Sequence, residues 1–80
     1  MRRRPPREWI GLAGVASWPR LREALTLSQQ SELRGVLIAL PAETRPLVVT
    51  EFLAEVERMP FGPALLVALA RAAGPHGGAR

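Results

Sequence analysis

One segment, residues 45–59 (RPLVVTEFLAEVERM), constrains the fold most, because both its helical pattern and its boundaries can be read directly. Thr44 precedes it as an N-cap whose hydroxyl can accept a hydrogen bond from a free amide, Pro46 falls in the first turn, and Pro60 follows the far end. Its apolar residues recur at the spacing of a helix with one buried face; they are Leu47, Val48, Val49, Phe52, Leu53, Val56 and Met59. We therefore predict the core helix of the protein here.

A second helix is predicted immediately before this one. Thr26 with Gln29, or Ser28 alone, can cap a helix that runs to Leu40, and Pro41 ends it. Its buried stripe would consist of Leu33, Val36, Leu37 and Leu40. The connection over residues 41–44 is short, so the two helices should be neighbours in space.

Helices are also predicted at both ends of the chain. A short one over residues 8–16 is weakened by Gly11 and Gly14, and a break over residues 17–19 restarts the helical pattern to about Leu25. The last helix would begin at Pro63, stop before Gly74, and be apolar on more than one side. We expect two of its faces to be covered.

These patterns predict an all-α fold, a small bundle of four or five short helices in a single domain over residues 8–74. Strands over residues 36–40 and 47–50 are a weaker alternative, because both runs lie within longer helical periods. Residues 1–7 are predicted to form a flexible arginine-rich arm, and residues 75–80 a flexible glycine-rich tail.

The charge of the chain is unevenly distributed. The net charge is +4, but the first seven residues contain four arginines, whereas residues 8–80 hold seven arginines and seven glutamates. The longest apolar run, over residues 64–70, is far shorter than the roughly 20 residues needed to cross a bilayer. The sequence has no cysteine, which fits a reducing compartment. We expect a cytoplasmic protein that makes no membrane contact.

The residue types argue against enzymatic chemistry, which needs a titratable side chain held by a partner. The chain has no Cys, Asp, Lys or Tyr, and its one histidine, His76, lies in the glycine-rich tail. Glu51 and Glu55 could bring two carboxylates together at i, i+4, but a solvated acidic stripe partly offset by Arg58 is the better interpretation. We expect no enzymatic activity, cofactor, metal site or small-molecule substrate.

Nucleic-acid binding is the first functional hypothesis. The two central helices have the outline of a helix-turn-helix, but the exposed side of the second would present glutamates to phosphate, which argues against reading of the major groove. A weaker form of the nucleic-acid hypothesis remains, in which arginines contact phosphate without sequence specificity. The arginines in question are Arg2, Arg3, Arg4 and Arg7, with Arg20 and Arg22.

Protein binding is the second hypothesis and the preferred one. Apolar residues make up 48% of the chain, more than so small an interior should enclose. Leu27 and Ile38 lie off the main stripe of their helix, which leaves them for the surface. We expect Trp9, Trp18 and Phe61 to supply affinity, and the arginine arm and an acidic face to supply orientation; that face comprises Glu51, Glu55 and Glu57.

The predicted function is therefore a non-enzymatic module that binds another protein or protein complex, or a second copy of itself. Short, cysteine-free helical chains with an arginine tail are common among phage and mobile-element products that inhibit or adapt a larger complex, anti-CRISPR proteins among them. The assignment to phage or mobile-element products rests on this general likeness in length and composition, and on no motif.

Overall fold

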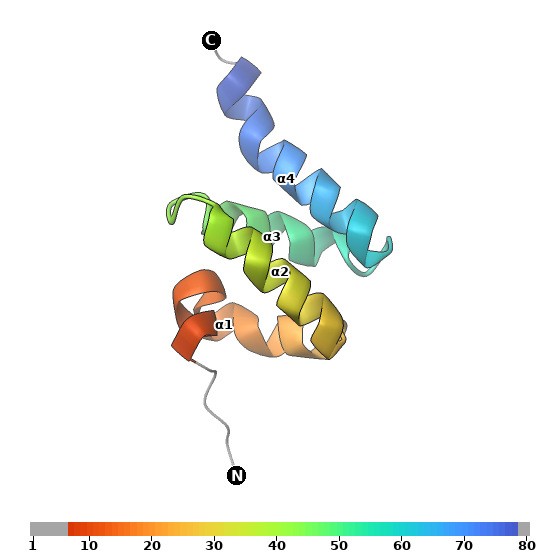
Figure 1. The fold of residues 1–80 in the computed structure, drawn as a ribbon. Helices are drawn as coiled ribbons and strands as arrows, with labels where there is room; N and C mark the ends of the chain where they lie inside the picture. The colour runs from red at the N-terminus through yellow and green to blue at the C-terminus, as the bar shows by residue number, and fades with distance from the viewer. Residues whose placement is uncertain (1–6, 79–80) are drawn as a thin grey trace.

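The computed structural model describes residues 7–78, and these residues are helical throughout except for short connections, with no strand. Four helices follow in order: α1 (Arg7–Ala24), α2 (Leu27–Ala39), α3 (Arg45–Glu55) and α4 (Phe61–Gly78) (Figure 1). Because α1 consists of two helical segments joined at a kink, the prediction of four or five short helices is confirmed. The strand alternatives are excluded, since both runs belong to α2 and α3. Of the arm predicted over residues 1–7, residues 1–6 lie outside the described residues and Arg7 begins α1.

The kink in α1 lies at Gly14, where the backbone has φ 86° and ψ 160°. Only glycine adopts this conformation readily, because it has no Cβ to clash with the backbone. The break was predicted three to five residues later, at 17–19, and that prediction was wrong. Pro19 lies instead inside the second segment, close to its start, where it removes one backbone hydrogen bond.

The start of α2 follows the sequence closely. The Thr26 hydroxyl accepts a hydrogen bond from the Gln29 amide at 3.1 Å, and the Gln29 side chain accepts one from the Thr26 amide at 3.1 Å. This capping box satisfies two amides that have no partner within the helix. The first of the two predicted caps is therefore confirmed, and Ser28 is not needed.

The ends of α3 differ from the prediction. Thr44 is its N-cap, but the hydroxyl makes no capping hydrogen bond, because residues 42–44 already form a helical turn in which Thr44 has φ −83° and ψ −25°. The helix ends at Glu55 and not at Met59. The Arg58 amide donates to the Glu55 carbonyl at 2.9 Å, a tighter turn that diverts the chain before Pro60.

Helix α4 is longer than predicted at both ends. It begins at Phe61, and the Ala64 amide donates to the Pro60 carbonyl at 2.9 Å as its first helical hydrogen bond. Pro63 therefore occupies the third position, where its missing N–H costs nothing. The helix continues to Gly78, past Gly74 and Pro75, so the end predicted before Gly74 is wrong.

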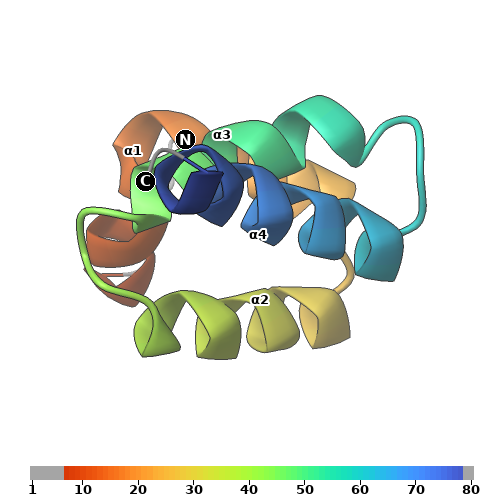
Figure 2. The ribbon, with the colours of Figure 1, turned by 90° about the horizontal axis from the view of Figure 1, so that it is seen from above.

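Helix α3 is the centre of the fold. Its contacts with α4 are the most extensive, followed by those with α1, while α2 packs mainly on α1. Figures 1 and 2 show α4 and α1 on opposite sides of α3. Side chains from all four helices form one core; its most deeply enclosed members are Leu21, Leu33, Leu37, Val48, Val49, Phe52, Ala64 and Ala68. The core therefore joins all four helices, with α3 at its centre.

Candidate protein-binding surface

Each of the four helices has at least one exposed large apolar side chain, and the most exposed of these lie on α2 and α4. Leu27 and Ile38 on α2 are 82% and 52% exposed, and Leu66 on α4 is 68% exposed. Ile10 and Leu47 are less exposed, at 43% and 48%. The prediction that Leu27 and Ile38 lie at the surface is confirmed.

The two exposed aliphatic residues of α2 fall on one line along the helix, together with Ser31 and Arg34. Leu27, Ser31, Arg34 and Ile38 are separated by four, three and four residues, the spacing of one helical face. We call this set the α2 outer face. The residues at 33 and 37 point the other way and are enclosed in the core. Helix α2 thus has an apolar inner face and an outer face with an exposed aliphatic side chain at each end.

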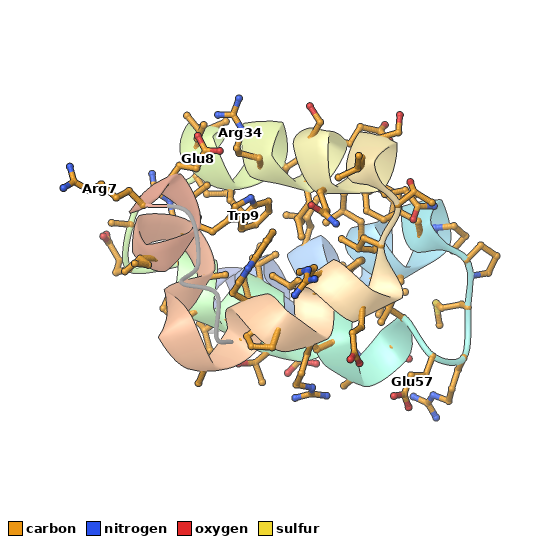
Figure 3. All side chains as sticks on the ribbon, turned by 90° about the horizontal axis from the view of Figure 1, so that it is seen from below. Arg7, Glu8, Trp9, Arg34 and Glu57 are labelled. Atoms are coloured by element: carbon orange, nitrogen blue, oxygen red, sulfur yellow. The ribbon has the colours of Figure 1, made fainter. Side chains whose placement is uncertain are left out.

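The tryptophans are not part of this surface, which corrects the prediction that they are exposed anchors. Trp9 is only 4% exposed, and its ring stacks on that of Trp18 with centroids 4.9 Å apart. The kink at Gly14 allows the two segments of α1 to bring these rings together. Figure 3 shows Trp9 directed between α1 and α2, toward the core. Trp9 belongs to the core and Trp18 packs against it, so the stacked pair contributes to stability.

Phe61 is likewise a packing residue and not an exposed contact. It is half-buried at the start of α4, and its ring meets the edge of Phe52 with centroids 5.6 Å apart. The interplanar angle of 78° is the edge-to-face geometry that aromatic pairs favour. The predicted cluster of Trp9, Trp18 and Phe61 is therefore wrong as an exposed patch.

The predicted acidic face is also wrong in its central member. The side chain of Glu55 is only 2% exposed and lies between two arginines. Arg58 donates to its Oε1 at 2.8 Å, and Arg71 of α4 donates to its Oε2. Arg71 also contacts Glu51 Oε1 at 3.3 Å. These four side chains, which we call the Glu55 cluster, connect α3 to α4.

The Glu55 cluster favours the charged forms of Glu55 and Arg71. Hydrogen bonds from Arg58 and then Arg71 hold the pKa of the Glu55 carboxyl below its ordinary value, against the opposing effect of burial. Hydrogen bonds to Glu55 and Glu51 raise the pKa of Arg71. The carboxylates of Glu51 and Glu55 are therefore both paired with arginine, and only Glu57 of the predicted acidic face is exposed.

The arginines divide sharply between those with partners and those without. Within residues 7–78, every arginine after α1 binds an oxygen of the protein: Arg34 to Glu8, Arg45 to backbone carbonyls, and Arg58 and Arg71 to Glu55. The three on α1 make no side-chain hydrogen bond or ion pair in this part of the chain; they are Arg7, Arg20 and Arg22. All three are exposed, and Figure 3 shows Arg7 pointing away from the body. Arg2, Arg3 and Arg4 lie outside the described residues.

Two of the partnered arginines were missed by the sequence analysis. The Arg45 guanidinium donates from Nε to the Leu37 carbonyl at 2.7 Å and from Nη2 to the Ile38 carbonyl at 3.3 Å, so it caps the end of α2. Arg71 is the one charged residue in the run 61–73. A lone charge in an apolar helix needs a partner, and that signal could have pointed to a carboxylate on a neighbouring helix.

Two surface depressions lie beside α1. One has a volume of ≈ 300 Å³ and combines an apolar floor with charged walls; its lining is Arg20, Glu23, Ala24, Leu53, Val56 and Glu57. The other has a volume of ≈ 320 Å³ and is mostly apolar; its lining is Ile10, Gly11, Leu12, Ala13, Gly14, Ala42, Arg45 and Pro46. Neither depression places a nucleophile beside a base.

Within residues 7–78, no group of three or more metal-ligating side chains is placed to hold a metal ion. Among the helices that the structure describes, none is long and apolar enough to cross a bilayer. Comparison with protein-family models, curated proteins and solved structures finds no match to this chain.

Proposed function

We propose that this chain is a non-enzymatic protein-binding module that attaches to a larger protein or complex through the α2 outer face. The observation that carries the proposal is the exposure of Leu27 and Ile38 beside a core that already encloses Leu33 and Leu37. Aliphatic side chains that repeat along one helical face are what a partner with an apolar groove contacts.

The layout of the α2 outer face supports a helical or grooved partner. Leu27 and Ile38 lie eleven positions apart, about three turns of helix, which is the length of a short helix-in-groove contact. Arg34 between them is held by Glu8 at 3.7 Å, and this exposed pair gives the surface polar groups that can set orientation. Affinity would come from the two aliphatic side chains.

We propose that the module acts as an inhibitor or adaptor of a larger complex, of the kind found among phage and mobile-element products such as anti-CRISPR proteins. The supporting features are the short chain, the absence of cysteine and the motif-poor helical sequence. The absence of cysteine is also our reason for placing the module in the cytoplasm.

A photo-crosslinking residue at position 38 tests this proposal. Irradiated in an extract of the cells that naturally contain the chain, it should capture a defined protein, and excess unlabelled chain should compete for that capture. The same residue at exposed position 32, on another side of α2, is the matched control. The α2 outer face would be rejected as the binding site if positions 32 and 38 captured the protein equally. It would also be rejected if the unlabelled Ile38→Glu variant competed for capture as well as the unlabelled unaltered chain does.

Nucleic-acid binding is a second candidate, supported by the free arginines of α1. Residues 1–24 contain six arginines and two glutamates, whereas residues 25–80 contain five of each, so the whole net charge belongs to the first part of the chain. Such a concentration of guanidinium groups can hold phosphate. Arg20, however, lies beside Glu23 and Glu57, which weakens the local field.

Salt dependence separates the two candidates. If α1 binds a labelled oligonucleotide, the affinity should fall steeply between about 50 and 200 mM salt. It should also fall in the Arg20→Gln/Arg22→Gln variant and stay unchanged in Ile38→Glu. No measurable oligonucleotide binding at low salt would remove this candidate and leave protein binding.

A further inference from the structure

The ion pair between Arg34 and Glu8 brings the start of α1 beside the α2 outer face. Arg34 Nη1 lies 3.7 Å from Glu8 Oε1, and Figure 3 shows the two side chains next to each other. Arg34 itself lies between Leu27 and Ile38 on the line of the α2 outer face. The first turn of α1 is therefore part of the surroundings of that face.

This ion pair is weak enough for Arg34 to exchange its partner. The side chains of Arg34 and Glu8 are 40% and 54% exposed, and water screens the attraction between exposed charges. Glu8 also lies in the first turn of α1, where the helix N-terminus stabilises a negative charge without a cation. The Arg34 guanidinium can therefore turn to the carboxylate of a binding partner at little cost.

Ser31 supplies a second hydrogen-bond donor at the same place. It is exposed and lies three residues before Arg34 on the α2 outer face, within one turn of helix. Its hydroxyl and the Arg34 guanidinium can both donate to one carboxylate. Leu27 and Ile38, at the two ends of the face, require apolar contacts instead. The face is therefore complementary to a carboxylate that lies between two apolar pockets.

The start of α1 adds positive charge beside this position. Arg7 is exposed, points away from the body in Figure 3, and makes no ion pair within residues 7–78. Three more arginines occupy positions 2–4, and the chain from Arg2 to Arg7 can span at most about 18 Å. Residues 1–8 thus carry four arginines against one glutamate, Glu8. This positive charge favours an acidic partner.

A protein fits these observations better than a nucleic acid does. Phosphate groups would satisfy the arginines, but the sugar–phosphate backbone that dominates such contacts would not cover Leu27 and Ile38, which are 82% and 52% exposed. A groove on a protein supplies apolar pockets and carboxylates on one surface.

We propose that the α2 outer face and the first turn of α1 form one composite site that binds an acidic groove of a protein partner. One carboxylate of the groove binds Arg34 and Ser31 between the apolar contacts of Leu27 and Ile38, and further acidic side chains lie opposite Arg7. This composite site rests on the proposed function and adds to it the chemistry of the partner.

Carbodiimide coupling tests for the carboxylate directly. The chain has no lysine, so Arg34→Lys introduces a single side-chain amine, which carbodiimide joins to a carboxylate in contact with it. In the cell extract used for capture at position 38, this variant should couple to the same protein. Arg20→Lys is the matched control, because Arg20 is exposed and lies beside Glu57 between α1 and α3. Its coupling to that protein should not exceed the level of the unaltered chain.

Competition between unlabelled variants gives a second measurement that does not depend on the introduced lysine. Arg34→Gln should require about tenfold more chain than the unaltered sequence to compete for capture at position 38, because it loses a charged hydrogen bond to the partner. Arg20→Gln removes the same charge from the other side of α1 and should compete as well as the unaltered chain.

The outcomes separate the composite site from the proposed function. Capture at position 38 without excess coupling of Arg34→Lys, or equal competition by Arg34→Gln and Arg20→Gln, would overturn the acidic site and leave the proposed function standing. Loss of capture after nuclease treatment of the extract would overturn it in favour of nucleic acid. A complete absence of capture at position 38 would contradict the proposed function and the composite site together.

Discussion

At the scale of single residues, the carboxylate of Glu55 connects two helices by ion pairing. It is enclosed between α3 and α4, and it accepts hydrogen bonds from Arg58 and Arg71. Within residues 7–78, no buried side-chain nitrogen or oxygen lacks a hydrogen-bond partner, so the Glu55 cluster is complete. A completed polar cluster of this kind fixes how two helices pack, while removal of one member leaves a charge unpaired.

Acid should therefore weaken the fold through Glu55. Its pKa is lowered in the folded protein by Arg58 and Arg71, so its contribution is fully present above the pKa of an unfolded glutamate, about 4.3. That contribution is lost as the pH falls through the lower folded value. Urea unfolding at pH 7 should show that Glu55→Gln is less stable than the unaltered chain, and the difference should shrink at pH 3.

Glu32→Gln is the control for this experiment, because Glu32 is exposed on α2 and makes no ion pair within residues 7–78. It should follow the unaltered chain at both pH values. If Glu55→Gln also followed the unaltered chain at both, the ion pairs of Glu55 would contribute nothing to stability.

The burial of Glu55 could not be read from the sequence. Helical spacing placed it beside Glu51 on the polar side of α3, and that placement was correct for α3 alone. Helical spacing does not reveal which neighbouring helix covers that side of α3. The clue was Arg71, sixteen residues further along, a lone charge in an apolar run that required an anion nearby.

At the scale of helices, the shape of α1 depends on Gly14. Its backbone conformation, with φ 86°, bends the helix so that Trp9 stacks on Trp18. A side chain at this position would meet no neighbouring atom within 4 Å, so the requirement for glycine comes from the backbone and not from packing. Such a conformation costs about 1–3 kcal/mol for a residue with a Cβ.

Gly14→Ala should accordingly lower the free energy of unfolding by about 1–3 kcal/mol. Gly11→Ala is the matched control, because Gly11 is helical, exposed and also free of contacts, and alanine there should raise stability by about 0.5–1 kcal/mol. Tryptophan fluorescence during urea unfolding reports both changes. Equal effects of the two substitutions would show that the kink is not needed for the fold.

The helices that sequence predicted best are those with local boundary signals. Thr26 with Gln29 gave the start of α2, and Pro46 fitted the first turn of α3, because capping and proline effects act within a few residues. The kink was misplaced because proline and glycine both interrupt helices, and the sequence does not say which of the two ends the first helical segment here.

At the scale of the whole molecule, the surface divides into regions of different character. The cationic excess belongs to residues 1–24, aliphatic side chains are exposed on α2 and α4, and the acidic groups of α3 are largely occupied by arginine. The all-α class and the surplus of apolar residues were predictable from pattern and composition. Which apolar residues remain outside was predictable only for α2, where helical spacing separated Ile38 from Leu37.

The account as a whole requires that the exposed aliphatic side chains contribute to binding and not to the core. The most direct test is urea unfolding of two alanine variants at adjacent positions of α2, Leu37→Ala and Ile38→Ala. Leu37 is fully enclosed and its loss should cost about 2–5 kcal/mol. Ile38 is 52% exposed, and its loss should change stability by no more than about 0.5 kcal/mol. Comparable destabilisation by both variants would contradict the account, because Ile38 would then belong to the core and α2 would have no aliphatic surface to offer a partner.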